Sequence, residues 1–171
     1  MANTFVKIAA VTVGAGGAAE IAFTSIPSTY TDLCVELSLR DGTSAQSVNG
    51  NIVFNSNTSS IYSARRLFST GSGVGSDSYS SLGSMPGIWI NSATSTSNTF
   101  ANIMIYIPNY AGSTNKSVSI DSVTENNASS AYSGLSAGLF ASTAAITSLG
   151  ISTGSNFVQY STATLYGIKN S

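Results

Sequence analysis

The chain has 171 residues, the usual size of one domain, and it is long enough to bury a core without disulfides or metal ions. Charged residues make up only 8% of it, against about 25% in average proteins, and the net charge is −1. The six basic residues are scattered, which argues against nucleic-acid binding. No apolar run is long enough for a membrane helix, and the N-terminus lacks a signal-peptide pattern.

Strand patterns recur along the whole chain, beginning with residues 5–13 and 19–23. The glycine-rich segment 14–17 separates them, and glycine enters positive φ without steric cost. We therefore predict a hairpin here.

Residues 33–40 show the clearest alternation. Leu33, Val35, Leu37 and Leu39 occupy one face of the predicted strand, and the polar side chains between them occupy the other. Strict period-2 alternation is typical of a sheet with one dry face.

Further strands are predicted at residues 51–54, 61–68, 88–90, 100–107, 117–123, 134–141, 146–152 and 157–168. In the last run the apolar phase shifts between Tyr160 and Leu165, which indicates a bulge or a bend between two sheets. Loops are expected at residues 41–50, 69–83 and 91–98. The glycine- and serine-rich loop 69–83 is expected to be mobile, or ordered only against a partner.

No segment shows a helical period, an internal repeat or a linker. We therefore predict one all-β domain over residues 1–171, a two-sheet antiparallel β-sandwich. About ten strands must cover each other's apolar faces, and the jelly roll, a fold common in viral proteins, is the connectivity that we expect.

The sequence offers little catalytic chemistry, because it contains no histidine. Asp121 and Glu125 are four residues apart, but a solvated strand end explains them better than a catalytic pair. The single cysteine, Cys34, is expected to be a buried small residue. We predict no catalytic, cofactor-binding or metal-binding residue, and the chain is expected not to be an enzyme.

Aromatic residues are the remaining candidates for recognition. The tyrosines are spread over the whole chain instead of gathering on one or two loops. Most of them are expected to lie in the core or on a sheet face, and Tyr79, in the predicted loop 69–83, is the one expected to be an exposed contact. Trp89 lies between two isoleucines and is expected to pack in the interior.

Two segments carry a resemblance, Ile-Pro-Asn-Tyr-Ala-Gly at residues 107–112 leading into Lys-Ser-Val-Ser-Ile at 116–120, and the ending at residues 157–169. They resemble small virion proteins of tailed bacteriophages, particularly phages of aquatic bacteria and cyanobacteria. Such proteins are capsid decoration (cement) proteins, head fibres or tail-fibre domains.

The resemblance implies a homotrimer that is made in the host cytoplasm, sits on the capsid surface and clamps neighbouring major capsid subunits. The start at Met1 favours a complete decoration protein over a fibre fragment. A fibre domain that recognises host glycan is the alternative. A carbohydrate-degrading enzyme is a third possibility, and the sparse carboxylates count against it.

Overall fold

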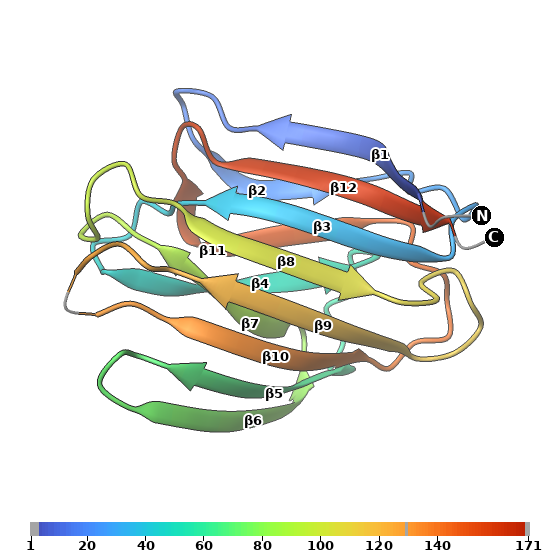
Figure 1. Ribbon diagram of the computed structural model, residues 1–171. Coiled ribbons are helices and arrows are strands. Elements are labelled where there is room, and N and C mark those ends of the chain that lie inside the picture. The colour runs from blue at the N-terminus through green and yellow to red at the C-terminus, as the bar shows by residue number, and fades with distance from the viewer. Residues whose placement is uncertain (1–3, 129, 170–171) are drawn as a thin grey trace.

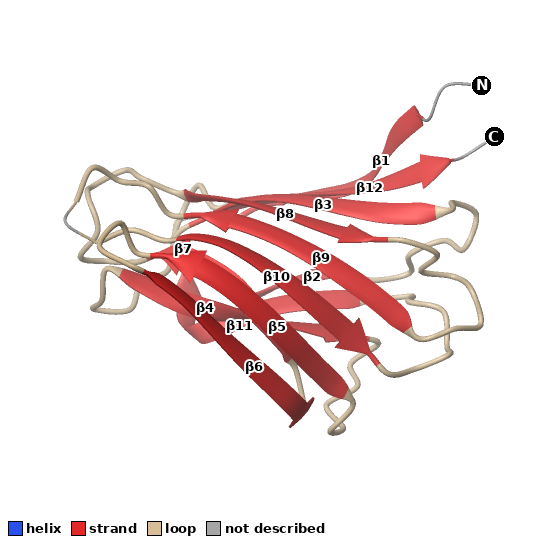
Figure 2. Cartoon of the chain, turned by 60° about the horizontal axis from the view of Figure 1, so that its bottom comes forward, coloured by secondary structure: helices blue, strands red, loops and turns tan. Residues whose placement is uncertain are grey.

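Two antiparallel β-sheets pack face to face in this computed structural model, which describes residues 4–128 and 130–169 (Figure 1). The large sheet contains, from edge to edge, β1 (Thr4–Thr12), β12 (Thr162–Lys169), β3 (Asp32–Leu39), β8 (Ala101–Ile107), β9 (Lys116–Val123), β10 (Ser133–Phe140), β5 (Tyr62–Ser69) and β6 (Val74–Leu82). The small sheet contains β2 (Ala18–Phe23), β11 (Leu149–Phe157), β4 (Ser47–Phe54) and β7 (Met85–Asn91). The described chain contains no helix (Figure 2), so the predicted two-sheet β-sandwich is confirmed.

Eight of the strands form nested pairs. In the large sheet β1 pairs with β12 and β3 with β8, while in the small sheet β2 pairs with β11 and β4 with β7. A long antiparallel hairpin that is wound into two sheets produces this order, which is the jelly-roll arrangement. The expected connectivity is therefore found in these eight strands.

The other four strands form two inserted hairpins that widen the large sheet. The hairpin β5–β6 is inserted between β4 and β7, and β9–β10 is inserted between β8 and β11. The two insertions meet where β10 pairs with β5. Small residues of β10 allow β7 to pack closely beneath it, because a Cβ added to Gly134 would lie 2.4 Å from the Trp89 ring.

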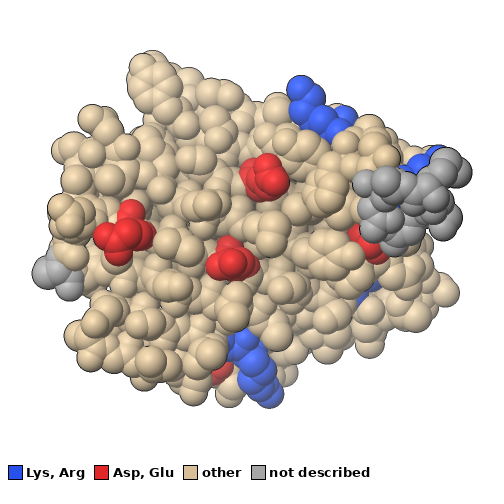
Figure 3. Space-filling model, in the orientation of Figure 1, with Lys and Arg blue, Asp and Glu red and all other residues tan. Residues whose placement is uncertain are grey.

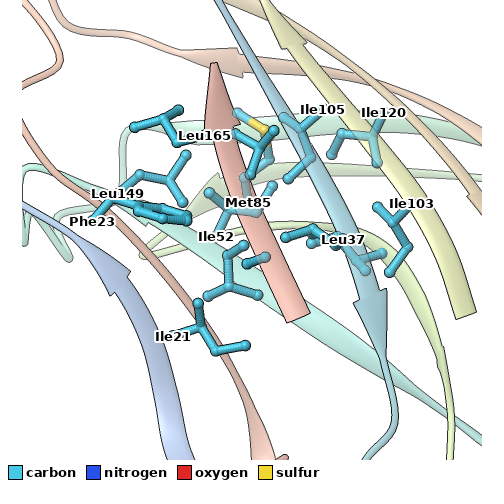
Figure 4. Close-up of a cluster of buried hydrophobic side chains, with 14 of the residues drawn as sticks. Ile21, Phe23, Leu37, Ile52, Met85, Ile103, Ile105, Ile120, Leu149 and Leu165 are labelled. Atoms are coloured by element: carbon cyan, nitrogen blue, oxygen red, sulfur yellow. The ribbon is translucent and has the colours of Figure 1, made fainter. Parts of the chain in front are cut away.

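The core lies between the sheets and is made of alternating side chains from both. Figure 4 shows Ile21, Ile52 and Leu149 of the small sheet close to Leu37 and Leu165 of the large sheet. Each of these side chains is buried, and full burial of a large aliphatic side chain contributes roughly 1.5–3 kcal/mol. The alternation predicted for residues 33–40 is confirmed, because the four alternate apolar residues are buried and Glu36 is exposed.

The hairpin predicted from residues 5–13 and 19–23 is wrong. The glycine turn exists, with Gly17 at a φ of 71° and its N–H donating to the carbonyl of Gly14 at 3.0 Å. However, β1 and β2 belong to different sheets. The turn carries the chain from one layer to the other, so that each strand directs apolar side chains into the core from opposite sides.

The loop predicted at residues 69–83 is also wrong, because most of this segment is strand β6. It pairs with β5 through a regular antiparallel register from Ser69–Val74 to Ala64–Tyr79. The long run predicted at residues 157–168 is divided into the last residue of β11, a turn at residues 158–161 and β12 as far as residue 168. The bend expected there is confirmed, and it takes the form of a turn that crosses from the small sheet to the large one.

Candidate functional site

The outer face of the large sheet is a broad regular surface. None of the described residues forms a second layer over it (Figures 1 and 2). The inserted hairpins widen this face from four strands to eight. Alternate residues of each strand point outward, so the strand register decides which side chains lie together on it.

One line of outward residues crosses six neighbouring strands. The register partners, taken from β12 to β5, are Thr164, Glu36, Met104, Asp121, Leu135 and Leu67. We call this line the central row. Neighbouring strands lie about 4.8 Å apart, so the central row is about 24 Å long.

The apolar side chains of the central row are unusually exposed. Met104 is 47% exposed, Leu135 58% and Leu67 54%. Leu135 and Leu67 are direct cross-strand partners, so they form one contiguous apolar area. A group of exposed large apolar side chains is more informative than scattered single ones, because it marks a surface suited to a partner.

Two shallow hollows adjoin along this row. One has a volume of about 570 Å³, and its lining includes Glu36, Asn102, Met104 and Asp121. The other has a volume of about 450 Å³, and its lining includes Leu67, Leu135 and again Asp121. Open depressions on a sheet can receive side chains of a docking partner.

The face carries little charge. Figure 3 shows separate acidic side chains within it and basic side chains towards its margins. The basic Arg65 is exposed on β5, and its guanidinium donates to the carbonyls of Ala64 and Tyr79 at 3.0 and 3.1 Å. A partner that covers the central row would take water from the carboxylates of Glu36 and Asp121, so it must offer them hydrogen-bond donors or basic groups.

An ion pair on the inner side of the sheet supports the β5–β6 hairpin. Arg66 donates to both carboxylate oxygens of Asp77, at 2.7 and 2.6 Å, and to the Tyr79 hydroxyl at 2.9 Å. The guanidinium also stacks on Trp89, 4.7 Å from the ring centroid. Hydrogen bonding to Arg66 holds the pKa of Asp77 below its usual value, outweighing partial burial.

Arg66 contacts both aromatic residues for which the sequence analysis made a prediction, Tyr79 and Trp89. Tyr79 is half-buried and bonded to Arg66, so the prediction that it is an exposed contact is wrong. Trp89 is buried, as predicted. Tyr160, which the sequence does not distinguish from the other tyrosines, is the most exposed aromatic residue among the described part of the chain.

The carboxylates singled out from the sequence lie on β9 and in the turn that follows it. Asp121 and Glu125 are both exposed, as expected for a strand end and the turn that follows it. Asp41 is buried and accepts hydrogen bonds from Thr43, Ser92 and Thr153. Burial would raise the pKa of Asp41, but these hydrogen bonds outweigh it and lower the pKa. Asp41 therefore links its own loop to the loop after β7 and to strand β11, and each of its carboxylate oxygens accepts at least one hydrogen bond.

Lys116 is buried and bonds only to main-chain oxygens. Its Nζ donates to the carbonyls of Gly112 at 2.7 Å, Ser142 at 3.4 Å and Thr114. Burial lowers the pKa of this amine. These hydrogen bonds hold the loop between β8 and β9 against the start of β9.

Across residues 4–128 and 130–169, no three or more His, Cys, Asp or Glu side chains are grouped so that they could hold a metal ion. The same residues contain no helix with the length and hydropathy needed to span a bilayer. Comparison of the chain with family models, curated proteins and solved structures gives no match.

Proposed function

We propose that this chain is a non-enzymatic structural protein that docks through the central row of its large sheet. In this proposal it is a capsid decoration (cement) protein of a tailed bacteriophage. It forms homotrimers on the head and stabilises contacts between major capsid subunits. The exposure of Met104, Leu135 and Leu67 on one line of a weakly charged sheet is the observation that carries the proposal.

The energetics of docking support this role. Burial of the exposed half of two leucine side chains contributes about 1 kcal/mol each. Asp121, the cross-strand partner of Leu135, and Glu36 lie in the same row, so this gain is kept only if the partner supplies donors or basic groups to their carboxylates. A protein that binds only the assembled lattice stabilises that lattice by mass action.

The test compares the wild type with the double variant Leu67→Ser, Leu135→Ser. Both should melt at nearly the same temperature, because the two side chains lie outside the core. Wild-type protein should sediment with expanded empty capsids, and the double variant should bind them at least about tenfold more weakly.

The control is Ser117→Ala with Ser119→Ala, which changes the same face outside the central row and should bind like the wild type. Wild-type protein that stays in the supernatant would overturn the decoration role. Equal binding by the double variant would place the interface elsewhere on the molecule. Sedimentation equilibrium tests the homotrimer, and a monomer at capsid-saturating concentration would contradict it.

Glycan binding by a head- or tail-fibre domain is the second candidate function. The exposure of Tyr160 favours it, because an uncovered aromatic ring is a common platform for a sugar.

A further inference from the structure

Tyr160 has a backbone conformation that bulky residues rarely adopt. It lies in the turn between β11 and β12 with a φ of 72°, and it is 68% exposed. A large side chain at positive φ costs about 1–3 kcal/mol, whereas glycine would avoid that cost. Among residues 4–128 and 130–169, neither its hydroxyl nor its ring takes part in a hydrogen bond, an aromatic pair or a cation–π contact, and the ring is the most exposed aromatic side chain of this part of the chain.

The turn that presents Tyr160 is held by hydrogen bonds. The Tyr160 N–H donates to the carbonyl of Val13 at 3.0 Å. The carbonyl of Arg40 accepts from the Val158 N–H at 2.9 Å and from the Ser161 hydroxyl at 3.1 Å. The ring therefore stands on a rigid support.

Arg40 also holds the loop opposite this turn. Its Nη1 donates to the carbonyls of Thr96 and Thr99 at 2.8 and 2.9 Å, and its Nη2 donates to those of Ser95 and Ala93 at 3.1 and 3.4 Å. One residue thus binds the turn through its main chain and the loop through its side chain. The two segments are fixed relative to each other before any ligand arrives.

Between these segments is an open hollow of about 340 Å³, within the range of roughly 300–1,000 Å³ for small-molecule sites. Its walls include Tyr160, Phe100, Asn98 and Gln159. Asn98 and Gln159 are exposed, and in the described structure their side-chain amides make no hydrogen bond. The hollow therefore combines an uncovered aromatic ring with two planar amides, each of which can donate and accept.

We propose that this hollow binds a neutral sugar residue of a glycan. The Tyr160 ring stacks against the C–H face of the pyranose, and the amides of Asn98 and Gln159 bond to its hydroxyls. No carboxylate lines the hollow, and the guanidinium of Arg40 is engaged by four carbonyls, so the site offers no free charge. This inference gives residues to the second candidate function, and it does not depend on docking by the central row.

The test uses saturation-transfer NMR on the full chain with maltotriose, mannotriose and globotriose, and with 3′-sialyllactose as the anionic probe. At least one neutral trisaccharide should bind, with a Kd of about 1 mM, as expected for one stacked sugar. Its addition should shift the side-chain amide signals of Asn98 and Gln159. Absence of binding by all three neutral probes, or tighter binding of the anionic one, would overturn the proposal.

The decisive variant is Tyr160→Gly, which removes the ring and relieves the backbone. Sugar binding should fall at least tenfold, while the melting temperature should be no lower than that of the wild type. Tyr160→Phe should keep most of the binding.

The matched control is Ser81→Gly, since exposed Ser81 has a φ of 57° in the distant β6 strand. It should also leave the melting temperature no lower, with sugar binding unchanged. Unchanged binding in Tyr160→Gly, or a clear loss of stability, would contradict the assignment. Capsid cosedimentation of Tyr160→Gly should equal that of the wild type, and its loss would make the hollow a protein contact instead of a sugar site.

Discussion

Burial raises the pKa of the Cys34 thiol. The residue points towards the outer face of β3, but its cross-strand neighbours are Tyr166 and Tyr106, and it is buried. Burial first, and the nearby negative charge of Glu36 second, raise the pKa of the thiol from 9.0 to about 11. The folded protein therefore keeps this thiol protonated at neutral pH.

We expect native Cys34 to react with iodoacetamide at pH 8 far more slowly than the urea-unfolded chain. The unfolded thiol ionises near pH 9 while the folded one keeps its proton, so stability should fall as the pH rises from 9 to about 11. Burial also raises the pKa of Tyr62 and Tyr110, which adds to the alkaline loss. Urea titrations at pH 8 and 10.5 should show a smaller loss in Cys34→Ala. Rapid labelling of the native protein would contradict this expectation.

Strand β3 shows how one element specifies its own placement. Its alternate leucine and valine side chains face the small sheet, while Glu36 faces outward into the central row. A shift of the register by one residue would bury Glu36, so the alternation determines both the face and the pairing with β12 and β8.

We predict that Leu37→Asp prevents folding. The carboxylate would lie in the core without a partner, at a cost of several kcal/mol, against a total stability of roughly 5–15 kcal/mol for a typical domain. Circular dichroism and a thermal melt should show no cooperative transition. Ser38→Asp, one residue along and on the outward face, should melt nearly as the wild type does. A soluble Leu37→Asp variant with a cooperative melt would refute the assignment of this face.

On the scale of the whole molecule, the nested pairing joins segments that are far apart in the sequence. The first strand, β1, pairs only with the last, β12, which also pairs with β3. Folding must therefore wait for long-range contacts, and sheets built in this way fold slowly.

Deletion of everything after residue 161 should abolish cooperative unfolding. It would detach β1, expose the edge of β3 and remove Leu165 from the core. The control shortens the tip of the β5–β6 hairpin at residues 70–73 to Asn-Gly, which leaves the core unchanged and should preserve a sharp melt. Differential scanning calorimetry of both variants provides the measurement, and a cooperative transition in the truncated chain would contradict the proposed dependence on β12.

Local patterns predicted a large part of this architecture. The alternation at residues 33–40 is a property of neighbouring residues, so it identified β3 and its buried face correctly, and the strand predicted at residues 100–107 corresponds to β8. The prediction for residues 74–82 was wrong because serine, glycine and aspartate, which are typical of loops, occupy many of their positions. The ion pair between Arg66 and Asp77, which supports the strand, is not visible in the local sequence. The virion role and the homotrimer stay predictions.

The remaining features of the fold depend on pairing between segments that are far apart in the sequence. Whether residues 19–23 pair with residues 5–13 or lie in the opposite sheet depends on β11, more than a hundred residues away. The central row exists because five separate registers bring Glu36, Met104 and Leu135 into line. The hollow at Tyr160 exists because Arg40 reaches two distant segments. An alternating pattern tells a strand which side to bury, but it carries no information about which strand will lie next to it.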